Sequence, residues 1–166
     1  MSFSQFLASA PEAVREFRTL EIYHPDFSET LRFVKDFVDQ SLTLESTAPR
    51  NPGQTVVFTA LSMQVTEPQE SDGSESLLAV KLGAVGNEVQ DHISQIVDTL
   101  EPIQVIYRKY YSGDTSEPVT VLSLAVSSLS FNSYESVSFT CEDVDFANKN
   151  SGILYTTETF VLLRNA

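Results

Sequence analysis

The residues best suited to chemistry in this 166-residue sequence are two histidines, His24 and His92, and a single cysteine, Cys141. Neither histidine has a cysteine or a carboxylate at the spacing of a metal site such as HExxH. We expect His24 to pack in a turn at a strand end, and His92 to lie at the rim of a helix. Cys141 alternates with Val137 and Phe139, which predicts a buried, inert thiol in a strand.

Two short segments have the composition of ligand-binding loops but lack the spacing that such loops require. Residues 83–86 (GAVG) join an expected strand to an expected helix, but no Lys, Ser or Thr of a phosphate-binding loop follows. Residues 142–150 (EDVDFANKN) are rich in oxygen-bearing side chains, yet they lack the ligand order and the glycine of a calcium loop. We therefore predict no catalytic residue, no metal site and no cofactor, and we expect a protein that is not an enzyme.

Composition and charge limit the class of protein further. The net charge is −13, and the ten basic residues are scattered, whereas nucleic-acid binding needs clustered positive charge to neutralise phosphates. The sequence is 42% hydrophobic and 20% charged, which is typical of a folded domain. No apolar stretch approaches the roughly 20 residues of a membrane span. Because a basic leader is missing and a lone cysteine cannot form an intrachain disulfide, we expect synthesis in a reducing cytoplasm.

Hydrophobic periodicity predicts a short N-terminal helix with an apolar clip over residues 1–17, followed by one β-rich domain over residues 18–166. The apolar clip consists of Phe3, Phe6 and Leu7. Ser9 and the glutamate three positions later have the spacing of a capping box, and helical spacing follows. The clip can dock on the chain's own core or on a neighbouring subunit, and the sequence leaves both alternatives open.

Within the β-rich domain, alternating polar and apolar residues predict a series of short strands. These strands are expected over residues 18–24, 31–35, 40–45, 54–66, 77–82, 103–111, 119–126, 128–132 and 134–142. The first three are expected to form an antiparallel meander. An apolar stripe at helical spacing predicts a helix over residues 87–100, and the polar, acidic residues 67–76 are expected to form an exposed loop. Together these elements indicate an antiparallel barrel or sandwich with one capping helix.

Four segments, taken in order, resemble a known family of phage proteins. They are residues 18–24 (RTLEIYH), 47–60 (TAPRNPGQTVVFTA), 103–118 (IQVIYRKYYSGDTSEP) and 155–160 (YTTETF). The family has about this length, is known only as a domain of unknown function, and is encoded among the minor tail genes of long-tailed phages. Its most characteristic pieces are a turn with two prolines before a strand and a hairpin after paired tyrosines. Both are structural motifs, and neither indicates catalysis.

The resemblance implies a structural subunit of a phage tail tip or baseplate, which links the distal tail tube to the central hub and the receptor-binding apparatus. It is similar in role to the L-type minor tail protein of lambda-like phages. Those proteins carry a cysteine-rich part that holds an iron–sulfur cluster, and the single cysteine here predicts none. By the same analogy we expect a homo-oligomeric ring in the virion, a trimer in preference to a hexamer.

The alternative function is a receptor- or carbohydrate-binding module of the tail tip, for which Tyr110, Tyr111 and Tyr134 are the candidate aromatic residues. In a ring, heterologous contacts join each subunit to the next. Apolar residues towards both ends of the sequence are expected to make these contacts, because loose termini are usually polar. The candidate subunit-contact residues are Phe3, Phe6, Leu7, Phe160, Val161, Leu162 and Leu163.

Overall fold

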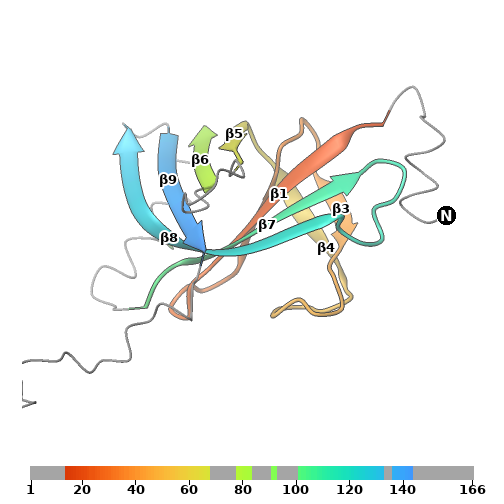
Figure 1. Ribbon diagram of the computed structural model, residues 1–166, viewed down its shortest axis with the longest axis horizontal. Coiled ribbons are helices and arrows are strands. Elements are labelled where there is room, and N and C mark those ends of the chain that lie inside the picture. The colour runs from red at the N-terminus through yellow and green to blue at the C-terminus, as the bar shows by residue number, and fades with distance from the viewer. Residues whose placement is uncertain (1–13, 68–77, 84–90, 93–100, 133–135, 144–166) are drawn as a thin grey trace, which may run out of the picture.

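The computed structural model describes residues 14–67, 78–83, 91–92, 101–132 and 136–143 (Figure 1). The elements in these ranges are all strands, so the prediction of a mainly β fold is confirmed. The strands are β1 (Glu16–Tyr23), β2 (Leu31–Val34), β3 (Gln40–Thr43), β4 (Thr55–Ala60), β5 (Met63–Thr66), β6 (Leu78–Gly83), β7 (Gln104–Tyr111), β8 (Thr120–Asn132) and β9 (Ser136–Asp143).

The nine strands form one sheet in the order β3-β4-β2-β1-β7-β8-β9-β6-β5. Neighbouring strands are antiparallel except β2 and β4, which run parallel. Within the described residues, β3 and β5 each pair on one side only. The sheet is therefore open, and the structure does not support the expected barrel or sandwich.

The continuity of the sheet depends on its longest strand, β8. Its first residues pair with β7, and the residues from Leu124 onward pair with β9, with a register shift between Val126 and Ser128. The sequence predicts two strands here, over residues 119–126 and 128–132, but a β-bulge bends one continuous strand instead. Figure 1 shows that β8 curves at this point, so that β9, β6 and β5 stand across β1 and β7.

The first three strands were expected to form a meander, and this prediction is wrong for the third strand, β3. β1 and β2 do pair as an antiparallel hairpin, but β4 lies between β2 and β3. β3 pairs with β4 alone in this part of the sheet, because the chain returns from β3 and inserts β4 beside β2. Strand identity could be predicted from periodicity here, but strand order could not.

The single strand expected over residues 54–66 is in fact two strands, β4 and β5, which lie towards opposite ends of the sheet. After β4 the Leu61 N–H donates to the Val34 carbonyl at 2.9 Å, and the chain then crosses to pair as β5 with β6. The buried side chains change phase at this crossing, from an even position in β4 (Phe58) to odd positions in β5 (Met63 and Val65). Alternate residues of a continuous strand face the same side of the sheet. The switch from even to odd buried positions therefore marks the break between β4 and β5.

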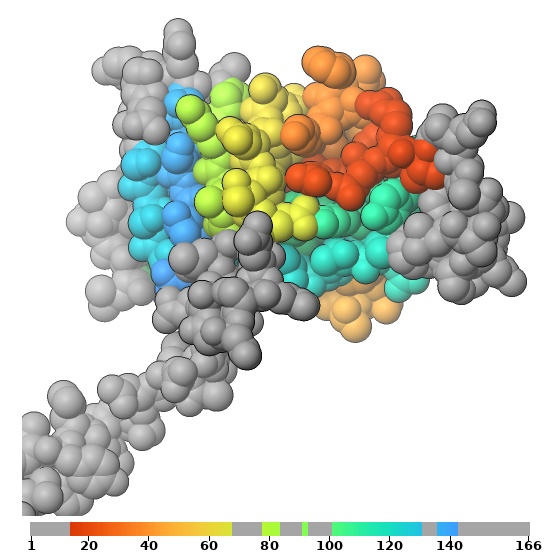
Figure 2. Space-filling view, turned by 45° about the horizontal axis from the view of Figure 1, so that its top comes forward, coloured from red at the N-terminus to blue at the C-terminus, as the bar shows by residue number. Residues whose placement is uncertain are grey.

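The larger core lies inside the curve of the sheet. It is formed by one face of seven strands, β1, β2 and β5 to β9, and includes Leu20, Ile22, Leu31, Phe33, Met63, Val65, Leu78, Val80, Leu82, Val105, Tyr107, Leu124, Val137, Phe139 and Cys141. Figure 2 shows β5, in yellow, close to β1, in red, because the open sheet curls around this core. Cys141 is fully buried, which confirms the predicted core cysteine, and this burial raises the pKa of its thiol to about 12.

A smaller core lies on the opposite face of β1, β2 and β7. It consists of Phe17, Val34, Leu42, Leu44, Ala48, Phe58 and Tyr110. β3, β4 and the turn segment, which we define as residues 44–54, supply the residues that cover this face. The face of β1 and β7 beneath the turn segment is therefore shielded from water.

The two expected helices have different outcomes. Residues 14–17 of the N-terminal helix are not helical, since β1 already begins at Glu16 and Phe17 packs in the smaller core. Of the helix expected over residues 87–100, only Asp91 and His92 lie in the described ranges, and both are helical. No helix in the described part of the chain is long and apolar enough to cross a membrane.

Candidate functional site

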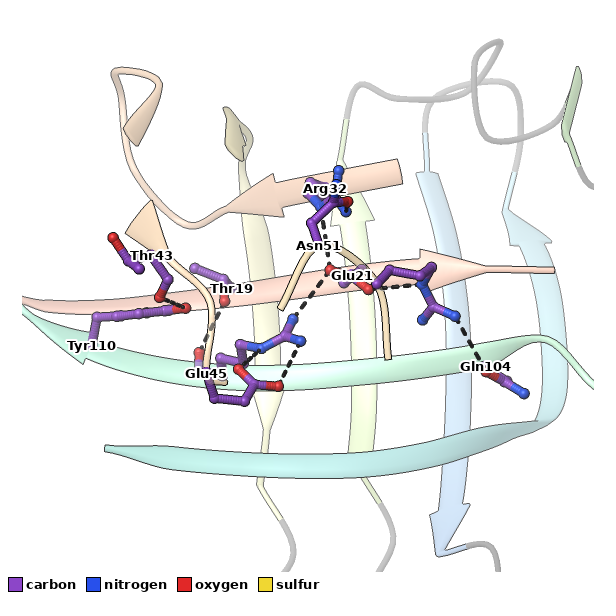
Figure 3. Close-up of polar contacts among 10 residues, drawn as sticks. Thr19, Glu21, Arg32, Thr43, Glu45, Asn51, Gln104 and Tyr110 are labelled. Carbon is purple, nitrogen blue, oxygen red and sulfur yellow. Dashed lines mark hydrogen bonds and ion pairs between the residues drawn. The ribbon is translucent and has the colours of Figure 1, made fainter. Parts of the chain in front are cut away.

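A group of charged side chains is enclosed between β1, β7 and the turn segment (Figure 3). At its centre are Glu21 and Arg108, whose side chains are both 0% exposed. They lie on neighbouring strands and on the face that the smaller core covers. Transfer of a charge from water into a protein interior costs several kcal/mol unless partners compensate for it. The partners of these two residues therefore determine whether the site is stable.

The Glu21 carboxylate accepts hydrogen bonds from three arginines. Its Oε2 accepts from Arg108 Nη1 at 3.3 Å and from Arg32 Nε at 3.2 Å. Its Oε1 accepts from Arg50 Nε at 3.0 Å. The three arginines come from β7, β2 and the turn segment, so one carboxylate joins three separate parts of the fold through charge-assisted hydrogen bonds.

Arg108 also binds Glu45, the second carboxylate of the cluster. Its Nε and Nη2 donate to the two oxygens of Glu45 at 2.7 and 2.9 Å, which is a bidentate pair. Burial alone raises the pKa of the Glu45 carboxyl, but the hydrogen bonds and the charge of Arg108 outweigh it and lower this pKa below its ordinary value. Glu45 is therefore an ionised structural anion rather than a proton donor at neutral pH.

The backbone of the turn segment reverses tightly, and this places its polar side chains next to Glu21 and Arg108. The Glu45 carbonyl accepts from the Gly53 N–H at 3.1 Å, and Asn51 and Gly53 adopt left-handed φ values of 52° and 65°. Asparagine and glycine tolerate this conformation, which lets the chain reverse tightly. Asn51 Oδ1 accepts from Arg32 Nη2 at 2.8 Å, and the Arg50 guanidinium lies 3.8 Å from the centre of the Tyr23 ring.

We define the buried ionic cluster as Glu21, Arg32, Glu45, Arg50 and Arg108. Three of the four segments that carry the family resemblance meet in it: residues 18–24 supply Glu21, residues 47–60 supply Arg50, and residues 103–118 supply Arg108. The fourth segment, residues 155–160, lies outside the described residues. The segments that typify the sequence thus converge on one network of ion pairs.

A family model of a domain of unknown function, DUF1833, matches residues 3–154. The chain belongs to this family. The sequence-based prediction that the chain belongs to a family described only as a domain of unknown function is confirmed. No curated protein matches the sequence.

Sequence reasoning did not find the buried ionic cluster of this family member. It identified the proline-containing turn and the tyrosine hairpin as elements that shape the chain, but it did not predict that their charges pair with Glu21. A usable signal was present, because Glu21 lies between Leu20 and Ile22, and Arg108 follows an apolar run that ends at Tyr107. A charge inside a buried strand needs a partner, and the charged residues of the turn segment are candidates for it.

A second set of polar contacts joins the end of β5 to β1 and β7. The Glu67 carboxylate accepts a hydrogen bond from the Tyr107 hydroxyl at 2.8 Å and also binds Lys109, while Arg18 lies 3.7 Å away. Glu67 was expected in an exposed loop over residues 67–76, but it is only partly exposed, and the remainder of that loop lies outside the described residues. Burial, followed by the Glu67 contact, raises the pKa of Tyr107.

The two basic residues that form the densest local pair, Arg108 and Lys109, point to opposite faces of β7. Each binds a carboxylate, Glu45 for Arg108 and Glu67 for Lys109. They therefore do not form a basic patch of the kind that nucleic-acid binding requires.

Both histidine rings lie close to the ring of Phe27. The His24 and His92 rings have centroids 5.7 and 5.4 Å from that of Phe27. His24 is 1% exposed, and its Nδ1 accepts from the Asp26 N–H at 3.2 Å, which confirms its predicted packing in a turn. His92 is buried and its Nε2 lies 3.3 Å from Ser28 Oγ. No group of three or more potential metal ligands is found among the described residues.

The residues expected to make subunit contacts all lie outside the described part of the chain: Phe3, Phe6, Leu7, Phe160, Val161, Leu162 and Leu163. The same holds for Tyr134. Tyr110, proposed as an exposed aromatic residue, is instead fully buried, and its hydroxyl donates to the Thr43 carbonyl at 3.0 Å. A shallow hollow of about 290 Å³ over β5, β6, β8 and β9 is lined mainly by polar side chains such as Thr66, Lys81 and Thr140.

Proposed function

We propose that this chain is a structural subunit of a phage tail tip or baseplate, which links the distal tail tube to the central hub and receptor-binding apparatus and performs no catalysis. The observation that carries this proposal is the convergence of the family segments on the buried ionic cluster. In that cluster each carboxylate is already bonded to a guanidinium. A general base must come within hydrogen-bond distance of the substrate proton that it removes, and these buried, paired carboxylates are not accessible to a substrate. Residues that fix shape in this way suit a building block.

The open sheet also supports assembly with neighbours. β3 and β5 are edge strands in the described sheet, and an edge strand can pair with a strand of another chain. Heterologous contacts around an axis close a ring, and we propose a homo-oligomeric ring in the virion, three-fold in preference to six-fold. We also propose that the helix expected over residues 87–100 caps one end of the curved sheet, because His92 packs edge-on against Phe27.

The alternative, a receptor- or carbohydrate-binding module, has less support. Tyr110, one of its three candidate aromatic residues, is buried. The hollow over β5, β6, β8 and β9 is lined by no exposed aromatic ring among the described residues. Protein sites for sugars and nucleobases commonly use such rings as stacking surfaces.

Deletion of the gene in the phage or prophage that encodes this chain tests the proposal. We expect non-infectious particles whose tails are absent or lack a tip in electron micrographs, because a missing ring interrupts assembly. Expression of the wild-type chain in trans should restore infectivity. Infectious particles with normal tails from the deletion strain would refute the structural role, and turnover of peptidoglycan by the purified protein would refute the absence of catalysis.

A further inference from the structure

The loop between β2 and β3 exposes two neighbouring apolar side chains. Phe37 is 99% exposed and Val38 is 66% exposed, the highest values among the large hydrophobic residues of the described ranges. A phenylalanine held in water gains nothing from the hydrophobic effect, although a buried ring is among the most stabilising side chains. The pair, which we call the exposed loop tip, is therefore a surface that a covering group would stabilise.

Hydrogen bonds hold this loop in place without any help from the Phe37 ring. The Asp36 carboxylate accepts from the Phe37 N–H at 2.8 Å and from Arg15 Nη2 at 2.7 Å. Asp39 Oδ1 accepts from the Ala60 N–H at 2.7 Å. The loop is ordered in advance, so a group that docks on the exposed loop tip need not supply the entropy of ordering it.

The N-terminal segment, residues 1–13, joins the described chain beside this loop. Arg15 is held to Asp36 by the ion pair at 2.7 Å, and the Arg15 carbonyl accepts from the Ser112 N–H at 2.9 Å. The Arg18 carbonyl accepts from the Lys35 N–H at 2.9 Å, which ties the start of β1 to the residues before the loop. These contacts fix the attachment point of the segment next to the exposed loop tip.

Residues 1–13 have the apolar composition that a segment covering the exposed loop tip would need. The segment contains the apolar clip and carries one charged side chain, Glu12, in a chain whose net charge is −13. An extended chain spans roughly 3.3–3.6 Å per residue, so the nine positions from Phe6 to Arg15 reach far enough to fold back on Phe37. Length, composition and attachment point all permit the contact.

We propose that residues 1–13 cover Phe37 and Val38 of the same chain, with the apolar clip as the contacting surface. The same chain is favoured over a second copy because a short tether gives an effective concentration in the millimolar range. Two copies, in contrast, repel each other through their acidic charge. This inference concerns the isolated subunit and goes beyond the proposed function.

Cross-linking of cysteines in the full-length chain tests this contact. The Gln5→Cys, Val38→Cys double variant keeps the apolar clip and Phe37 intact and adds one thiol to each side of the contact. The native Cys141 does not compete, because it is fully buried. We expect a short bismaleimide to give a cross-linked monomer, and the additional substitution Phe37→Ser to slow its formation about tenfold, since the ring supplies most of the contact.

The control is the Gln5→Cys, Lys81→Cys variant, whose second thiol lies at an exposed position of β6 in the other half of the sheet. It should give little cross-linked monomer under the same conditions. A cross-linked dimer as the main product of the Val38→Cys variant would overturn the proposal and show exchange of the segment between copies. Equal rates with and without Phe37→Ser would also overturn it. None of these results depends on a role in a phage tail.

Discussion

Replacement of Arg108 by methionine should lower the free energy of unfolding by about 3–5 kcal/mol, a large fraction of the stability of a domain of this size. Methionine fills a similar volume but leaves Glu21 buried without its partner on β7 and Glu45 without its bidentate partner. Urea denaturation followed by far-ultraviolet circular dichroism measures the loss, because the sequence has no tryptophan for a fluorescence assay.

The matched control is Arg15→Met, since Arg15 forms an equally short ion pair with Asp36 but is 64% exposed. The Asp36 side chain is only 3% exposed, but without Arg15 it still accepts hydrogen bonds from the Phe37 N–H and from Gln40 Nε2. An ion pair with a solvent-exposed partner contributes about 0–1 kcal/mol, so this variant should remain close to the wild type. Equal losses in the two variants would contradict a buried ionic cluster beneath the turn segment.

Acid should reduce the difference in free energy of unfolding between the wild type and the Arg108→Met variant. Arg108 lowers the pKa of Glu45 in the folded state below the value of the unfolded chain. A lowered carboxyl pKa stabilises the folded state above the unfolded value and stops doing so as the pH falls through the folded value. The stability gap should therefore be constant near neutral pH and shrink below about pH 4.5, where Glu45 begins to protonate in the unfolded chain.

Replacement of Phe58 by alanine should cost about 3–5 kcal/mol, because the ring is fully buried in the smaller core and its loss leaves a cavity. Its neighbour Val57 is 59% exposed, and Val57→Ala should cost less than about 1 kcal/mol. A one-residue slip of β4 would exchange the two faces. A larger loss for Val57→Ala than for Phe58→Ala, measured by the same denaturation assay, would therefore contradict the register of β4.

Much of the strand content could be predicted from the sequence, and the reason is local. Buried and more exposed side chains alternate along β6 and β9, and the sequence pattern behind this is visible without knowledge of any partner strand. Cys141 was placed correctly by the same alternation. Periodicity thus identified which residues face the larger core, although the second, more polar face of β1 and β7 remained unexplained.

The arrangement of the strands could not be predicted, because it depends on contacts between residues far apart in the sequence. The insertion of β4 between β2 and β3 and the crossing after Leu61 are decided by tertiary pairing. The buried ionic cluster has the same character, since Glu21 and Arg108 are 87 positions apart. Only the change of phase between Phe58 and Met63 was available as a local sign of the break between β4 and β5.

We propose that this chain is a fixed component of a phage tail tip, and its copy number in purified particles tests that proposal most directly. Quantitative mass spectrometry, with isotope-labelled peptides of this chain and of a tail protein of known stoichiometry, gives the number of copies per particle. We predict a constant value of about three, or about six for the less favoured hexamer, because a closed ring has a fixed number of subunits. Absence from the particles, or a copy number that varies between preparations, would contradict the account.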